Sequence, residues 1–201
     1  MAKRERNFRV LLLGDFVRLA YQPRVAELLA AEEGITLAVV GPAESTGDSG
    51  ALAGEIDRWL DEFDPEAVHL NCGLEDVRWY GKESRNAVSI GDYELNLVRI
   101  VDACKARVGG DVVFALTTAV DDKRQCDSPG SGFDRFNRDI EEYNIAAQEV
   151  MLAENVLINH LDRVIAERDD EYLAQDGVSL TATGVEAAAK ATAACIRSLW
   201  H

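Results

Sequence analysis

Five short apolar runs, each of strand length, recur along this chain and alternate with segments of helical pattern. Strands that are apolar throughout are typical of a parallel sheet covered by helices on both faces, because both sides of each strand are then buried. The runs occupy Phe8–Leu13, Ile35–Val40, Ala67–Asn71, Val112–Leu116 and Val156–Asn159.

Helical segments are expected between these runs, because apolar side chains recur there at i, i+3 and i+4 spacing. After a loop or ragged helical turn over residues 16–20, the first helix is predicted to start at Pro23, a residue favoured at the first helical position. The second helix is expected to be capped by Asp48 or Ser49. A polar, insertion-like loop is predicted over residues 77–90.

The second half of the chain continues the pattern. Asp92 is predicted to cap a helix whose buried stripe is expected to consist of Leu95, Val98, Ile100 and Val101, with Leu97 nearby. A long loop is predicted over residues 117–132. Further helices are expected over residues 133–154, around residues 161–165, and from Thr181 or Thr183 through Trp200.

This alternation predicts an α/β fold of one domain over residues 1–201: a three-layer α/β/α sandwich. Right-handed crossovers between five parallel strands favour the flavodoxin-like strand order 2-1-3-4-5. In such a sheet, ligands bind at the edge where the carboxyl ends of the strands lie.

Charge and composition exclude several function classes. The chain has 36 acidic and 21 basic residues, for a formal net charge of −15, which disfavours binding to nucleic acid or an anionic membrane. No stretch approaches the roughly 20 apolar residues of a membrane span, so a cytoplasmic protein is expected. The four cysteines lie far apart and indicate reduced thiols rather than a zinc site or a disulfide framework.

Four polar segments are predicted to converge at the carboxyl edge of the sheet: Asp15 with Phe16, Gly47, Gly73–Asp76, and Asp176–Ser179. Three of these segments resemble sequence blocks of the SGNH (GDSL-type) hydrolase superfamily. Leu12-Leu13-Gly14-Asp15 resembles the first block, Asn71-Cys72-Gly73-Leu74-Glu75-Asp76 the Gly-x-Asn-Asp block, and Asp176-Gly177-Val178-Ser179-Leu180-Thr181 the terminal Asp-x-x-His block.

The chain departs from this family at its catalytic positions. By the resemblance, the nucleophilic serine would fall at Phe16, the oxyanion-hole asparagine at Glu75 and the histidine base at Ser179. Asp176 matches the carboxylate that orients the base, and Gly47 aligns loosely with the oxyanion-hole glycine. A phenyl ring is no nucleophile, and a serine is no base near neutral pH.

The residues therefore favour a catalytically degenerate family member. Such a pseudoenzyme would bind a ligand or partner at the former ester-hydrolase cleft, with Asp15, Gly47, Gly73, Asp76 and His160 as candidate binding residues. No cofactor and no metal are predicted, and the oligomeric state is left open.

Two alternatives remain open. In the first, the protein is an active esterase or acylhydrolase, for example a deacetylase, that uses residues such as Ser49 as nucleophile or His160 as base; Gly47-Asp48-Ser49 spells the family's Gly-Asp-Ser, but after the second strand. In the second, it is a structural or assembly scaffold. His69 lies within a strand and is interpreted as a core residue.

Two further hypotheses concern what the edge of the sheet binds. Trp79, Tyr80 and the loop of residues 117–132 are candidates to line a cleft for a sugar or acyl group. The carboxylates of Asp15, Glu75, Asp76 and Asp176 could together hold Mg²⁺ or Ca²⁺. The preferred interpretation is that arginines such as Arg18 and Arg78 and backbone amides neutralise them.

Overall fold

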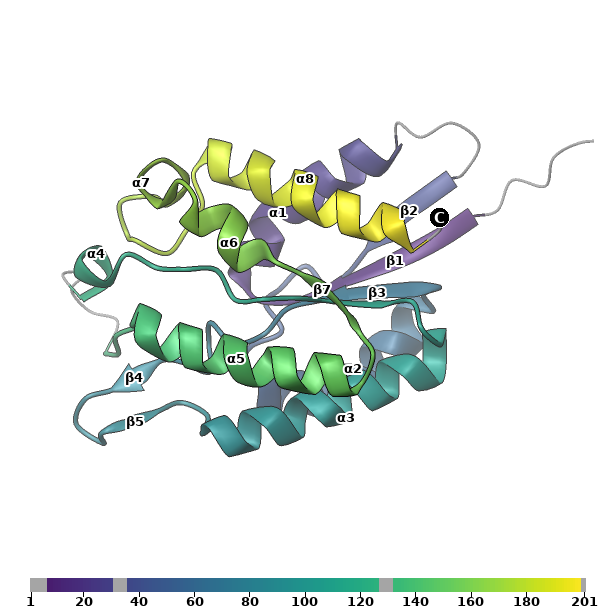
Figure 1. The fold of residues 1–201 in the computed structure, drawn as a ribbon. Coiled ribbons are helices and arrows are strands. Elements are labelled where there is room, and N and C mark those ends of the chain that lie inside the picture. Colours follow the sequence, from purple (N-terminus) through teal and green to yellow (C-terminus); the bar gives the residue numbers. More distant parts are fainter. Residues whose placement is uncertain (1–6, 31–35, 127–131, 200–201) are drawn as a thin grey trace, which may run out of the picture.

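A parallel five-stranded sheet forms the centre of the protein (Figure 1). The computed structural model describes residues 7–30, 36–126 and 132–199. The strands are β1 (Asn7–Leu13), β2 (Thr36–Val40), β3 (Ala67–Leu70), β6 (Val112–Ala115) and β7 (Leu157–Asn159). Their order is β2-β1-β3-β6-β7, which confirms the predicted order 2-1-3-4-5 when the sheet strands are counted along the chain.

Helices cover both faces of this sheet, so the predicted three-layer architecture is confirmed. One layer consists of α1 (Phe16–Ala30), α8 (Ala182–Ser198), α6 (Leu161–Ala166) and α7 (Asp169–Tyr172). The other consists of α2 (Ser49–Phe63), α3 (Ile90–Val108) and α5 (Asn137–Ala153), with α3 packed against both of its neighbours. In Figure 1 these layers lie above and below the sheet. No helix within the described ranges has the length and apolarity needed to cross a membrane.

The apolar runs of the central strands are buried as their sequence predicts, whereas the outer strands β2 and β7 are partly exposed, with Leu157 41% exposed. Every residue from Val10 to Leu13 has a side chain with no exposed surface, and all residues of β3 and β6 are buried. Strands β1 and β3 pair in parallel register, with Leu12 opposite His69. A strand that is buried on both faces is apolar at successive positions, whereas a strand with one solvent-facing side alternates apolar and polar residues.

Helix α1 starts earlier than predicted, at Phe16 rather than Pro23. The carboxylate of Asp15 accepts a hydrogen bond from the Val17 amide at 2.8 Å, and the Asp15 carbonyl accepts one from Leu19, so the helix is initiated directly after β1. Pro23 lies inside the helix, where its ring nitrogen has no hydrogen to donate. Residues 16–20, expected to form a loop or a ragged helical turn, are thus the regular first turn of α1.

The region around α3 also differs from the prediction. Ser89, not Asp92, caps this helix, and Asp92 lies in its first turn. Leu95 and Val98, expected in the buried stripe, are 70% and 37% exposed, because the apolar positions of α3 extend beyond the face that its neighbours cover. The predicted loop before α3 contains a two-stranded hairpin of β4 (Trp79–Tyr80) and β5 (Arg85–Asn86).

Helix α5 starts at Asn137, four residues later than expected, because the preceding segment is extended. There the amide of Asp134 donates to the carbonyl of Trp79 at 3.0 Å, and the Trp79 amide donates to the Asp134 carbonyl at 2.7 Å. The predicted loop of residues 117–132 contains a short helix, α4 (Asp122–Cys126), and its residues 127–131 lie outside the described ranges.

For two helices the sequence left two candidate capping residues, and the structure shows which of them caps the helix. Asp48 caps α2 by accepting a hydrogen bond from the Ala51 amide at 2.9 Å. Thr181 caps α8 by accepting one from the Gly184 amide at 3.1 Å. Helix α8 is described to Ser198, and Trp200 lies outside the described residues.

His69 is a core residue, as expected. Its ring has no exposed surface, and the side-chain amide of Asn159 lies 3.1 Å from Nε2. Burial lowers the pKa of His69 to about 4, so the ring is neutral in the folded protein. In the unfolded chain the ring takes up a proton near its ordinary pKa of 6.5.

We expect His69 to weaken the fold as the pH falls from about 6.5 to 4, because the unfolded state then binds a proton that the folded state does not. The cost approaches about 3 kcal/mol at pH 4. His69→Gln should remove this dependence from the free energy of unfolding, measured by urea denaturation between pH 4 and 8. His160→Gln is the control that removes a histidine outside the core. An identical pH profile for native protein and His69→Gln would contradict the expectation.

Candidate functional site

Asp15 and Asn71 join the ends of β1 and β3 at the carboxyl edge of the sheet. The Asn71 side-chain amide donates to Asp15 Oδ2 at 3.0 Å, and both residues are buried. Gly14 is required beside them, because a Cβ there would lie 2.1 Å from Asn71 Oδ1. Burial raises the pKa of Asp15, while the hydrogen bonds from Val17 and Asn71 oppose that rise.

Phe16 occupies the first position of α1, directly after this junction. Its ring is half-buried and packs against the core. The guanidinium carbon of Arg135 lies 6.0 Å from the centre of the Phe16 ring and 4.8 Å from that of Phe133. An aromatic and cationic cluster therefore occupies the start of the helix.

Arg135 and Glu75 form a buried ion pair at this edge, with Arg135 Nη2 3.1 Å from Glu75 Oε1 and both side chains 6% exposed. Arg135 Nε also donates to the carbonyl of Leu74 at 2.7 Å. On its other side, Glu75 pairs with Arg78. The Glu75 carboxylate is thus enclosed by two guanidinium groups.

Arg135 keeps its charge in this environment. Burial and the neighbouring Arg78 lower its pKa to about 10, while the negative charges of Asp15 and Asp176 act in the opposite direction. Its guanidinium therefore stays protonated near neutral pH. The positive charge of Arg135 therefore interacts electrostatically with both Asp15 and Asp176.

Asp176 and Ser179 are joined in one tight turn. The Ser179 hydroxyl donates to Asp176 Oδ2 at 2.6 Å, and the amides of Val178 and Ser179 donate to Oδ1 at 3.0 and 2.8 Å. Burial raises the pKa of Asp176, but these hydrogen bonds outweigh it and hold the pKa below its ordinary value. The carboxylate is therefore ionised and already occupied by groups of its own turn.

Gly47 and Asp76 lie around the start of α2. The Gly47 amide donates to Ser45 Oγ at 3.2 Å. The Asp76 carboxylate accepts the Ser49 amide at 3.0 and 3.1 Å, which fixes α2 to the segment after β3. Burial raises the pKa of Asp76 to about 6, although the hydrogen bonds from Ser49 oppose this rise.

Gly73 and His160 lie at two other points of the edge. A Cβ at Gly73 would lie 2.2 Å from Thr117 Oγ1, so a glycine allows the segment after β3 to approach the one after β6. His160 precedes α6 and is half-exposed, with Nδ1 3.7 Å from Asp162 Oδ1. Neither residue contacts the Arg135–Glu75 pair through an ion pair or hydrogen bond among the described residues.

The acidic side chains do not form the cation site that was considered. Asp15 is bound by Asn71 and backbone amide, Glu75 by two arginines, and Asp76 by the Ser49 amide. Within residues 7–30, 36–126 and 132–199, no three His, Cys, Asp or Glu side chains are grouped to hold a metal ion.

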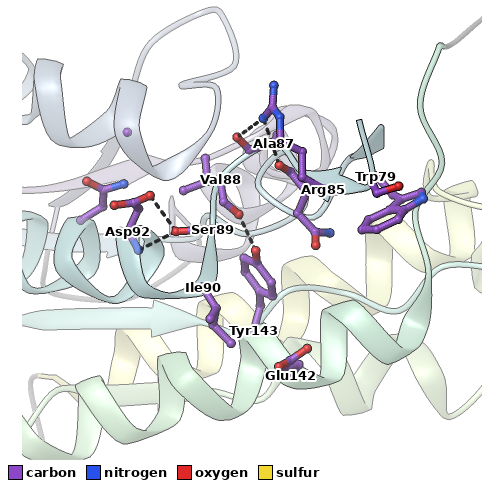
Figure 2. A pocket seen from close by; sticks show the side chains of 13 residues that line it. Trp79, Arg85, Ala87, Val88, Ser89, Ile90, Asp92, Glu142 and Tyr143 are labelled. Atoms are coloured by element: carbon purple, nitrogen blue, oxygen red, sulfur yellow. Dashed lines mark hydrogen bonds between the residues drawn. The ribbon is translucent and has the colours of Figure 1, made fainter. Parts of the chain in front are cut away.

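A cavity of about 670 Å³ lies beside this edge, between the β4–β5 hairpin and helices α3 and α5 (Figure 2). Trp79 lines it, as the sequence suggested for a ligand cleft, whereas Tyr80 packs edge-on against Phe133 at 6.2 Å. Thr117 lines a separate cavity of about 260 Å³ between α5 and α6. Trp79 and Thr117, which were expected to line a single cleft, thus line two different cavities.

Sequence reasoning did not identify Arg135 at all, and it assigned Arg78 only a neutralising role. The signal for Arg135 was weak, because it stood inside a predicted helix, where an arginine is ordinarily solvent-exposed. The segment is extended instead and brings Arg135 back to residues 60 positions earlier in the chain.

Breaking the buried pair should destabilise the protein. We expect Glu75→Gln to lower the free energy of unfolding by about 3 kcal/mol, because it removes the counter-charge of the buried Arg135 and of the partly exposed Arg78. Urea denaturation at pH 7 measures the loss. The matched control is Glu62→Gln, which breaks an exposed pair with Arg58 and should cost under about 0.5 kcal/mol. Equal effects of the two changes would contradict the assignment of a buried pair.

Solved structures of ester hydrolases have the same fold as this chain. A lipase/acylhydrolase from Enterococcus faecalis aligns over 96% of each chain with 20% identity and a TM-score of 0.78. The acetylxylan esterase Axe2 from Geobacillus stearothermophilus aligns over 97% of this chain and 96% of its own, also with 20% identity and a TM-score of 0.78. LAE5, an alpha/beta hydrolase from the metagenome of Lake Arreo, Spain, has 17% identity and a TM-score of 0.77 over 96% of this chain and 97% of its own. Comparisons with family models and with curated proteins give no match. The chain therefore has the fold of the SGNH-type ester hydrolases that its three sequence blocks resemble.

Proposed function

We propose that this protein is a catalytically inactive relative of SGNH-type ester hydrolases that binds a small ligand or a partner at the carboxyl edge of its sheet. The observation that carries this proposal is the buried Arg135–Glu75 pair beside Phe16. It stands at the position that the resemblance assigns to an oxyanion-hole asparagine.

Neither the nucleophile nor the base of a hydrolase has a replacement at these positions. Phe16 carries no nucleophilic atom, and the Ser179 hydroxyl donates its proton to Asp176, which has no imidazole to orient. In triad enzymes, loss of the nucleophile or the base alone lowers kcat by about 10⁶. Two such changes together account for an inactive protein.

Oxyanion stabilisation is also absent from the corresponding groups. A glutamate at position 75 accepts hydrogen bonds rather than donating them, and it is already enclosed by Arg78 and Arg135. The Gly47 amide already donates to Ser45 Oγ. Loss of one oxyanion-hole donor costs about 10² to 10³ in rate, so these changes add to the loss of the nucleophile.

The same groups suit the binding of a ligand. Phe16 and Phe133 present half-buried rings, and between them lies the buried guanidinium of Arg135, whose charge is balanced by Glu75. The accessible parts of such rings bind an acyl or carbohydrate group by apolar contact without reacting with it. A small acyl or carbohydrate ligand is therefore the ligand class of this proposal.

Ser49 is a poor candidate for an alternative nucleophile. Its side chain has no exposed surface, and its Oγ accepts a hydrogen bond from Asn96 at 2.9 Å. A substrate carbonyl cannot reach this atom without displacement of α2. This burial favours the inactive protein over an unorthodox hydrolase.

We expect native protein to hydrolyse p-nitrophenyl acetate and butyrate no faster than buffer. The variant Phe16→Ser/Glu75→Asn/Ser179→His restores the three missing side chains, and we expect turnover at least about tenfold above native, because nucleophile, donor and base then return together. Release of p-nitrophenol at 400 nm measures both rates.

Circular dichroism shows whether the triple variant is folded. Ser49→Ala and His160→Gln serve as controls in the native background and should leave the background rate unchanged. Native turnover that either control abolishes would overturn the proposal in favour of an active hydrolase.

A further inference from the structure

The cavity beside the hairpin is separate from the catalytic positions. Its volume of about 670 Å³ lies within the range of small-molecule sites. Its walls come from the hairpin, the start of α3 and one face of α5, and none of the residues at positions 15, 16, 75, 176 or 179 lines it. A ligand bound there would not depend on the state of the former catalytic site.

The walls of this cavity are held in place by contacts between segments distant in sequence. The Tyr143 hydroxyl on α5 donates to the Val88 carbonyl before α3, as Figure 2 shows. Asn86 on the hairpin donates to the Val77 carbonyl at 3.1 Å and to Asp139 at 3.3 Å. The cavity is therefore preformed rather than dependent on a ligand for its shape.

The charges that face the cavity are negative on balance. Arg85 is paired with Glu83 at 2.6 Å and donates to the carbonyls of Asn86 and Ala87. In the parts of the chain that are described, neither Asp92 on α3 nor Glu142 on α5 has a basic side chain at ion-pair distance. Asp92 is bound by the Ser89 hydroxyl at 2.6 Å, and Glu142 is exposed. Two carboxylates thus remain without a counter-charge.

An aromatic and apolar lining accompanies these carboxylates. Trp79, Val88 and Ile90 are half-buried, so each keeps part of its surface accessible at the cavity. Figure 2 shows Asp92 and Glu142 on different helices, with Trp79 on the hairpin. Carboxylates combined with an indole ring favour an organic cation, because the ring face attracts a cation and the carboxylates neutralise it.

We propose that this cavity binds a small organic ammonium ion with an apolar body, with Glu142 and Asp92 facing the charge and Trp79 contacting the cation or its body. The unpaired carboxylates disfavour anions, and the net charge of −15 raises the local concentration of cations. A neutral sugar of matching size would donate hydroxyl hydrogen bonds to the two carboxylates, but it would lack the Coulombic attraction that an ammonium ion gains from them.

The test uses three probes of similar shape, 2-phenylethylammonium, 3-phenylpropanol and 3-phenylpropionate, together with methyl β-xyloside as a neutral sugar. Binding to the full chain is followed by ¹H–¹⁵N NMR, which locates the site through the backbone amides. We expect the ammonium ion to bind with a Kd of about 1 mM or tighter and to shift amides of residues 85–92 and 142–143. The other three probes should bind at least about tenfold more weakly.

Glu142→Gln and Trp79→Leu should each weaken binding of the ammonium ion by about fivefold, because each removes one of the groups that face the cation. The matched control is Glu149→Gln, an exposed carboxylate on the same helix that does not line the cavity. Thermal melting shows whether each variant is folded.

Three results would overturn the proposal: no amide shifts at 10 mM ammonium ion, shifts confined to other regions, or equal binding of the alcohol, the carboxylate or the sugar. The esterase assay is independent of these results, since the cavity and the catalytic positions share no residue. Failure of one proposal can therefore be told from failure of the other.

Discussion

The buried carboxylate of Asp15 is the contact on which the carboxyl edge of this protein depends. It accepts the Val17 amide at the start of α1 and the side-chain amide of Asn71 at the end of β3. This one carboxylate thereby fixes the start of a helix to the ends of two adjacent strands. Only glycine fits at position 14, because a Cβ there would collide with Asn71. This junction sets the position of Phe16, the next residue in the chain and the first residue of α1.

The contacts that build the carboxyl edge join strand ends to helix starts. Asp15, Gly73 and Asp76 take part in these contacts, which do not require a reacting serine or histidine. Phe16 and the Arg135–Glu75 pair lie at the same edge. The Glu75 carboxylate is tolerated there because two guanidinium groups neutralise it.

One extended segment connects the carboxyl edge of the sheet with the cavity beside it. Asp134 pairs with the backbone of Trp79, and its neighbour Arg135 pairs with Glu75. The same few residues therefore position the guanidinium of one site and the indole of the other. Because the segment is extended rather than helical, the backbone groups of Asp134 are available to pair with those of Trp79, whereas a helix continued over this stretch would use them in its own hydrogen bonds.

Hydrophobic pattern alone determined the fold: five apolar runs require a sheet buried on both faces, and right-handed crossovers then fix its strand order. It also located the carboxyl edge of the sheet, because strand ends are visible in sequence. It misplaced the start of α1 and missed the hairpin, because the Asp15–Val17 bond and the pairing of short strands are not encoded in apolar periodicity.

The second partner of Glu75, Arg135, was decided only by tertiary structure. Arg135 lies 60 residues away in sequence and reaches Glu75 because an extended segment replaces the expected helical turn. The walls of the cavity likewise depend on contacts between distant residues, such as that of Tyr143 with Val88, 55 positions apart. Local sequence sets periodicity and strand ends, whereas ion pairs and cavity walls arise from side chains that meet only after the layers have packed.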